Sequence, residues 1–157
     1  MNLFDRLVQE ALRAENAPLN IRQVVEKELL HHDILREMSR AGLLEHMTLM
    51  GGTCLRSCYG AQRLSEDLDF TGGRDFKRED LSKLSHVIVD RLEEKYELSV
   101  SVSDPHRETG NTTTWKIKII TRPERPDLPA QKINIDICAI PSHQPRPMTL
   151  INHYGVE

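Results

Sequence analysis

The chain has 157 residues and a formal net charge of -3, with 38% hydrophobic and 29% charged residues. This length predicts a single domain, and this composition excludes a disordered chain and a membrane-embedded one. No stretch approaches the roughly 20 apolar residues of a spanning helix, and three cysteines are too few for a disulfide framework. We therefore expect a cytoplasmic protein with free thiols and no membrane partner.

The first half of the chain predicts two helices followed by a strand, a turn and a helix. Asn2 is the expected cap of a first helix that ends near Glu15. A second helix is expected to open at Asn20, with Gln23 in capping-box spacing, and to stop at Gly42. The elements expected next are a strand at Thr48–Met50, a turn at Gly51–Gly52, a helix at Thr53–Tyr59 closed by Gly60, and a strand at Asp67–Phe70.

The second half predicts one more helix and three strands. The helix is expected over residues 78–96, and alternating apolar residues predict strands at 97–103, 113–121 and 132–139, the first two being antiparallel neighbours. The order predicts an α/β or α+β globule with a mixed β-sheet flanked by helices. Residues 1–140 form the expected domain, and the proline-containing residues 141–157 are expected to be an irregular tail.

Charge is unevenly distributed along the second half. Residues 79–104 hold three Lys/Arg against seven Asp/Glu, whereas residues 105–132 hold six against three. Part of the surface is therefore expected to favour anions. Lys116 and Lys118 share one strand face, which either borders a site or faces water.

Three strand acids are the first candidate site residues. Because side chains of a strand alternate between faces, Asp67 and Asp69 should point the same way, roughly 6.6 Å apart. Asp136 should lie opposite the isoleucines of its own strand, on a polar face. Clustered carboxylates repel one another unless a cation neutralises them, and their hard oxygens suit Mg²⁺ or Mn²⁺.

The glycine turn is the second candidate. Gly51 and Gly52 permit close approach of a ligand to the backbone, and the helix that begins at Thr53 presents free N–H groups to a phosphate. A triphosphate held beside metal-binding carboxylates predicts nucleotidyl transfer, in which an acceptor hydroxyl attacks the α-phosphorus and pyrophosphate leaves.

The run TLMGGTCLRSCYGAQRLSEDLDF, followed by a lone acid in a later strand, resembles the signature of the nucleotidyltransferase superfamily of the DNA polymerase β type. The residues between the glycines and the acids resemble the narrower AbiEii/AbiGii-type toxin family of phage-defence and toxin–antitoxin systems: Leu55, Arg56, Tyr59, Gly60, Arg63, Ser65 and Glu66. The resemblance implies Mg²⁺-dependent transfer of a nucleoside monophosphate from a nucleoside triphosphate to an acceptor hydroxyl, in some members at the 3′ end of tRNA. It also implies a cognate antitoxin and toxicity through blocked translation.

These observations and the resemblance together predict three metal-binding acids and a set of nucleotide-binding residues. The expected catalytic and metal-binding residues are Asp67, Asp69 and Asp136, and the expected nucleotide-binding residues are Gly51, Gly52, Thr53, Arg56, Arg63 and Ser65. Arg56 and Arg63 hold phosphate oxygens, pair with Glu66 or are solvated on the helix surface. The family continues into a helical region with a Lys/Arg-rich motif, so the tail is expected to be the start of a missing C-terminal region. The alternative is then a truncated, non-catalytic module that binds a nucleotide or a partner.

One alternative function and two expectations about other residues complete the predictions. The sequence DLDFT also fits the nucleophile motif of haloacid-dehalogenase-type phosphatases, with Asp67 as nucleophile and Asp69 as general acid. The run His31–His32–Asp33 is expected to be solvated helix surface, because adjacent helical positions diverge by about 100 degrees. Cys54 and Cys58 are expected to be small core residues.

Overall fold

The computed structural model describes residues 1–16, 21–105 and 110–156. Within them, the helical elements are α1 (Leu3–Ala14), α2 (Arg22–Arg40), α3 (Gly51–Tyr59), the 3-10 helix η2 (Arg78–Leu81) and α4 (Leu84–Tyr96). The strands are β1 (Thr48–Met50), β2 (Leu68–Thr71), β3 (Val100–Ser103), β4 (Thr112–Ile119) and β5 (Gln131–Cys138). Residues 141–156 form neither helix nor strand.

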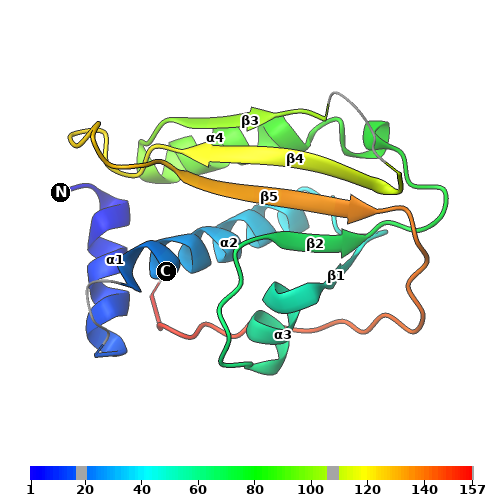
Figure 1. Ribbon diagram of the computed structural model, residues 1–157, viewed down its shortest axis with the longest axis horizontal. Helices are drawn as coiled ribbons and strands as arrows, with labels where there is room; N and C mark the ends of the chain where they lie inside the picture. Colours follow the sequence, from blue (N-terminus) through cyan, green and yellow to red (C-terminus); the bar gives the residue numbers. More distant parts are fainter. Residues whose placement is uncertain (17–20, 106–109, 157) are drawn as a thin grey trace.

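The five strands form one mixed sheet in the order β1-β2-β5-β4-β3 (Figure 1). Only β2 and β5 run parallel, with Leu68 beside Ile135 and Asp69 beside Asp136, while the other pairs are antiparallel. Parallel neighbours need a long crossover, which the chain makes through α4, β3 and β4. The expected α/β fold is confirmed, and the crossover places the early acids beside the late one.

The two faces of the sheet differ in character. One face packs against α2 and α4, which lie behind the sheet in Figure 1, and its side chains are buried: Leu68, Phe70, Trp115, Ile117, Ile119, Ile133, Ile135 and Ile137. Because side chains alternate, the opposite face carries the intervening residues of each strand, which are half-buried or exposed in β4 and β5. Asp69 and Asp136 belong to this second, polar face.

Helix α2 is buried on more sides than its sequence predicts. The expectation of solvated surface at His31–His32–Asp33 is wrong for the first and third residues, since His31 is 1% exposed and Asp33 is 4% exposed. Helix α2 contacts α1, α4 and β5, so it has little free surface. Asp33 is stabilised in the interior by Lys95, at 2.9 Å, and by the Tyr96 hydroxyl of α4.

Most predicted boundaries agree with the structure to within a few residues. Asn2 caps α1 by accepting a hydrogen bond from the N–H of Asp5, and α2 ends just before Gly42. The single helix expected over residues 78–96 is instead divided into η2 and α4. The predicted capping residue Asn20 lies outside the described residues. None of the described helices is both long and apolar enough to cross a membrane.

Candidate active site

Three acids line the junction between β2 and β5. Asp69 and Asp136 are register partners on the polar face, where parallel strands lie about 4.8 Å apart. Asp67 immediately precedes β2, and its Oδ1 accepts a hydrogen bond from the backbone N–H of Asn134 at 3.2 Å. The structure therefore places all three acids along one strand pair, although Asp69 and Asp136 are 67 positions apart in the chain.

The acids concentrate negative charge without a paired cation. Burial, then the charge of Asp136 and that of Asp67, raise the pKa of Asp69 above its ordinary value. Within the part of the chain that the structure describes, no Lys, Arg or His forms an ion pair with any of the three. The negative charge at this junction therefore favours binding of a cation.

The donor chemistry of this junction fits a divalent cation, because carboxylate oxygens are the ligands that Mg²⁺ and Mn²⁺ prefer. The three carboxylates do not form a preassembled shell, however. Among residues 1–16, 21–105 and 110–156, no three His, Cys, Asp or Glu side chains are grouped closely enough to hold one metal ion. The carboxylate of Asp67 is engaged by the backbone of β5 instead.

The glycine turn lies directly against the acids. Met50, the last residue of β1, is the register partner of Asp69, and α3 begins at the next residue. Gly51 has a φ of +73°, and a Cβ at this position would lie 2.8 Å from Oδ2 of Asp69. A Cβ at Gly52 would lie 3.0 Å from Oγ of Ser65. Only glycine lets the start of α3 approach the acids this closely, which brings its free N–H groups to the same place.

Other predicted nucleotide ligands have different surroundings. Thr53 is buried, and its hydroxyl donates to the backbone carbonyl of Asp67 at 2.5 Å, so its side chain positions the segment before β2. Ser65 lies beside Gly52, and Arg63 is exposed in the loop between α3 and β2.

Arg56 faces away from the solvent. Its Nε donates to Oε1 of Glu28 at 2.5 Å and its Nη1 donates to the carbonyl of Ala61 at 3.1 Å. Glu28 also accepts a hydrogen bond from the hydroxyl of Tyr154. The ion-pair partner of Arg56 is thus Glu28, and not Glu66, which was one of the alternatives left open by the sequence. Arg56 thereby connects α3 to α2 and, through Glu28 and Tyr154, to the C-terminal segment.

Two supporting residues were not identified from the sequence. Oγ1 of Thr114 in β4 donates to Oδ1 of Asp136 at 2.5 Å. Nε2 of His31 donates to the backbone carbonyl of Glu66 at 2.8 Å, and burial lowers the pKa of His31 to about 4, so the ring is neutral. Alternation places Thr114 on the polar face of its strand, but only the register of β4 with β5 brings it to Asp136.

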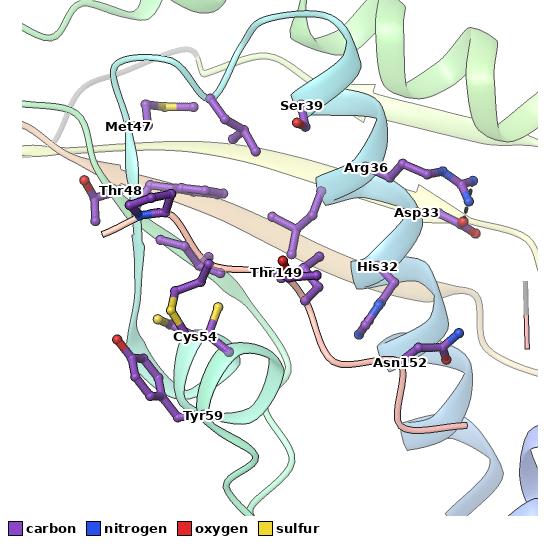
Figure 2. A pocket seen from close by; sticks show the side chains of 18 of the residues that line it. His32, Asp33, Arg36, Ser39, Met47, Thr48, Cys54, Tyr59, Thr149 and Asn152 are labelled. Carbon is purple, nitrogen blue, oxygen red and sulfur yellow. Dashed lines mark hydrogen bonds and ion pairs between the residues drawn. The ribbon is translucent and has the colours of Figure 1, made fainter. Parts of the chain in front are cut away.

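A cavity of about 1110 Å³ lies elsewhere, between α2, α3 and residues 142–156. Figure 2 shows the C-terminal segment passing between the two helices, with His32 of α2 and Cys54 of α3 on either side of it. None of the three acids lines this cavity, and neither does Gly51 or Gly52. The cavity and the acidic junction are therefore separate features.

The phosphatase interpretation does not agree with the position of the acids. In that family the nucleophile motif is expected at the end of a buried apolar strand, whereas Asp67 lies just before β2. A glycine pair that opens a helix, an Asp-x-Asp at the neighbouring strand and a third acid on the next strand match the arrangement that the sequence resemblance implies for a nucleotidyltransferase.

The family whose profile matches residues 33–155 is described as "Nucleotidyl transferase AbiEii toxin, Type IV TA system". This match covers most of the chain, and the protein belongs to the AbiEii nucleotidyltransferase toxin family. A search of curated proteins finds no match.

Two solved structures from Helicobacter pylori are similar in fold. JHP933 has 20% sequence identity and a TM-score of 0.49, over 81% of this chain and 51% of JHP933. A candidate nucleotidyltransferase has 20% identity and a TM-score of 0.47, over 76% of this chain and 48% of its own. The chain thus spans about half the length of these two proteins.

Proposed function

We propose that the chain is the nucleotide-transferring part of a toxin, which moves a nucleoside monophosphate from a nucleoside triphosphate to an acceptor hydroxyl. The observation that carries this proposal is the contact between the glycine turn and the acids, since Gly51 is packed against Oδ2 of Asp69. A phosphate bound at the start of α3 therefore lies next to carboxylates that face it without a cation of their own.

Each group has a distinct role in the proposed reaction. The N–H groups at the start of α3 bind the β- and γ-phosphates, because Gly51 and Gly52 leave that backbone exposed. Asp67, Asp69 and Asp136, which are not grouped around one point in the described residues, would have to draw together to hold the divalent cation. When bound, the cation would supply positive charge to the phosphates and lower the pKa of the acceptor hydroxyl. The bond from the acceptor oxygen to the α-phosphorus forms as the bond to pyrophosphate breaks, and the hydroxyl proton passes to solvent.

Neighbouring residues keep the acids oriented. Thr114 leaves only Oδ2 of Asp136 without a protein partner in the described part of the chain. Thr53 and His31 hold the backbone at Asp67 and Glu66, one from α3 and the other from α2. These contacts limit the positions that Asp67 and Asp136 can take, which favours a productive geometry.

The acceptor in this proposal is RNA, with the 3′ end of tRNA as the specific candidate. Modification of that end would block translation and so explain toxicity. The type IV toxin–antitoxin description of the family supports a cognate antitoxin as a partner.

The direct test is incubation of the chain with labelled nucleoside triphosphates, total tRNA and Mg²⁺. We expect label in the RNA and loss of at least 100-fold of the rate in Asp69→Asn and Asp136→Asn. Asp90→Asn on the exposed surface of α4 makes the same chemical change away from the site and should retain the rate. Equal labelling by all four proteins would exclude these acids as the metal ligands.

The same proteins and reagents also test the alternative, that the chain is a non-catalytic module. In that case calorimetry would detect binding of a Mg²⁺–nucleotide complex to the chain, sensitive to Asp69→Asn, while no transfer occurs with any RNA. The short span of the chain relative to the two similar structures is the observation that makes this measurement necessary.

A further inference from the structure

A row of lysines occupies the polar face of the sheet beyond the acids. Lys116 and Lys118 of β4 and Lys132 of β5 are all exposed, and the alternation of their strands puts them on the face of Asp136. Ser101 and Ser103 of β3 continue this face as the register partners of Lys118 and Lys116. We call these five residues the lysine face.

The lysine face is not covered or neutralised by the described part of the chain. The helices that contact β3 and β5 pack on the opposite, apolar side of the sheet, behind it in Figure 1. None of the three lysines takes part in an ion pair among residues 1–16, 21–105 and 110–156. On β3, β4 and β5, Asp136 is the only acidic residue.

The placement of two of these lysines is unfavourable for the protein alone. Lys118 and Lys132 are direct register partners, so their ammonium groups share one patch of surface. Like charges opposite each other in a sheet repel and destabilise the pair. A bound polyanion would neutralise both ammonium groups and remove this repulsion. The arrangement therefore favours an anionic ligand.

The lysine face leads directly to the acids. Along β5, Lys132 precedes Asp136 by four residues, or about 13 Å, and along β4 Lys116 lies two residues, or about 7 Å, beyond Thr114, the partner of Asp136. An extended chain of phosphates that follows β4 and β5 would therefore end at the junction of the acids. The polar neighbours of the lysines on this face are serine, threonine and asparagine, which can form hydrogen bonds to a sugar–phosphate backbone and do not insert into lipid.

We infer that the lysine face binds the sugar–phosphate backbone of a single-stranded RNA segment and guides its end to the acids. This inference rests on the proposed function for the role of the RNA end, but the binding surface itself can be measured without any transfer. Contacts to phosphate are independent of base sequence and weaken as salt rises, because binding releases counterions.

The test compares two double variants that each remove two positive charges. Lys116→Gln with Lys118→Gln changes the lysine face, and Lys77→Gln with Lys83→Gln changes exposed lysines beside η2. The probe is a labelled 12-nucleotide single-stranded RNA, titrated with the full chain by fluorescence anisotropy at several salt concentrations. Loss of two phosphate contacts should reduce the salt slope by about 1.4 and weaken binding roughly 20-fold at 0.1 M salt. The control variant should match the unchanged protein.

Several outcomes separate this inference from the proposed function. Equal RNA binding by the two variants overturns the inference, even if the unchanged chain transfers nucleotides. Binding to anionic phospholipid vesicles that is lost only in the lysine-face variant, with RNA binding unaltered, overturns it in favour of a membrane surface. A chain that binds RNA through these lysines but never transfers a nucleotide supports the inference and overturns the proposed function. Unchanged Mg²⁺–nucleotide affinity, with a melting temperature no lower than that of the unchanged protein, would show that the fold and the nucleotide site of the lysine-face variant are intact.

Discussion

Replacement of Asp69 by Asn should stabilise the metal-free protein and abolish its response to Mg²⁺. The carboxylate of Asp69 lies beside Asp136, and parallel strands are about 4.8 Å apart. Two like charges about 5 Å apart repel by about 1 kcal/mol in water and about 3 kcal/mol at an effective dielectric constant of 20. Because Asp69 is half exposed, the lower value applies, and we expect the variant to gain about 1 kcal/mol in free energy of unfolding.

Mg²⁺ should reverse this order of stability. A cation that binds only the folded state stabilises it by RT ln(1 + [L]/Kd), so the unchanged protein should gain about 2.7 kcal/mol at a concentration 100 times its Kd. Asp69→Asn loses a central ligand and should gain far less.

The assay is urea denaturation followed by circular dichroism, first in EDTA and then across a Mg²⁺ series. Asp90→Asn on the exposed surface of α4 is the matched control and should behave like the unchanged protein in both conditions. A variant that is less stable than the unchanged protein in EDTA, or that gains equal stability from Mg²⁺, would refute the view that the three acids form a repulsive, cation-binding cluster.

Three further predictions follow from individual contacts. Gly51→Ala should weaken Mg²⁺–nucleotide binding measured by calorimetry at least tenfold, because its Cβ would displace Oδ2 of Asp69; Gly73→Ala, which also has positive φ but meets nothing within 4 Å, should leave binding unchanged. Arg56→Met should lower the free energy of unfolding in urea by about 3 kcal/mol, because it leaves the buried carboxylate of Glu28 without a cation; a loss below about 1 kcal/mol would contradict the structural role of this pair. His31 has a folded pKa of about 4 against 6.5 when unfolded, so its contribution is fully present above pH 6.5 and lost as the pH falls towards 4, by about 3 kcal/mol; His31→Gln should flatten this part of the stability profile, whereas exposed His86→Gln should not.

The local features of the site could be predicted from the sequence because each depends on residues close together in the chain. The change of periodicity located β1, and the glycines after Met50 indicated where α3 begins, although α3 includes both glycines and does not follow a separate turn at Gly51–Gly52. The alternation around Asp136 correctly put this acid on the face opposite the isoleucines of β5. The roles of these residues in binding metal and nucleotide stay predictions until the transfer assay is done.

The tertiary structure decided which residues the polar side chains contact. Arg56 is equally able to bind a phosphate, Glu66 or Glu28, and only the packing of α3 against α2 selects Glu28. His31 and Asp33 looked like helix surface because a sequence pattern shows which side of α2 is most apolar, but not how many neighbours will cover the other sides.

Contacts between side chains on different strands also could not be predicted from the sequence. That Thr114 would meet Asp136, and that Lys118 would meet Lys132, depends on the register between β4 and β5, which hydrophobic alternation leaves free to slip by two residues. The sequence determined which residues share a face of each helix or strand, since side-chain direction repeats within such an element. Only the folded sheet determined which exposed residues lie together, since strand order and register are set by contacts between segments far apart in the chain.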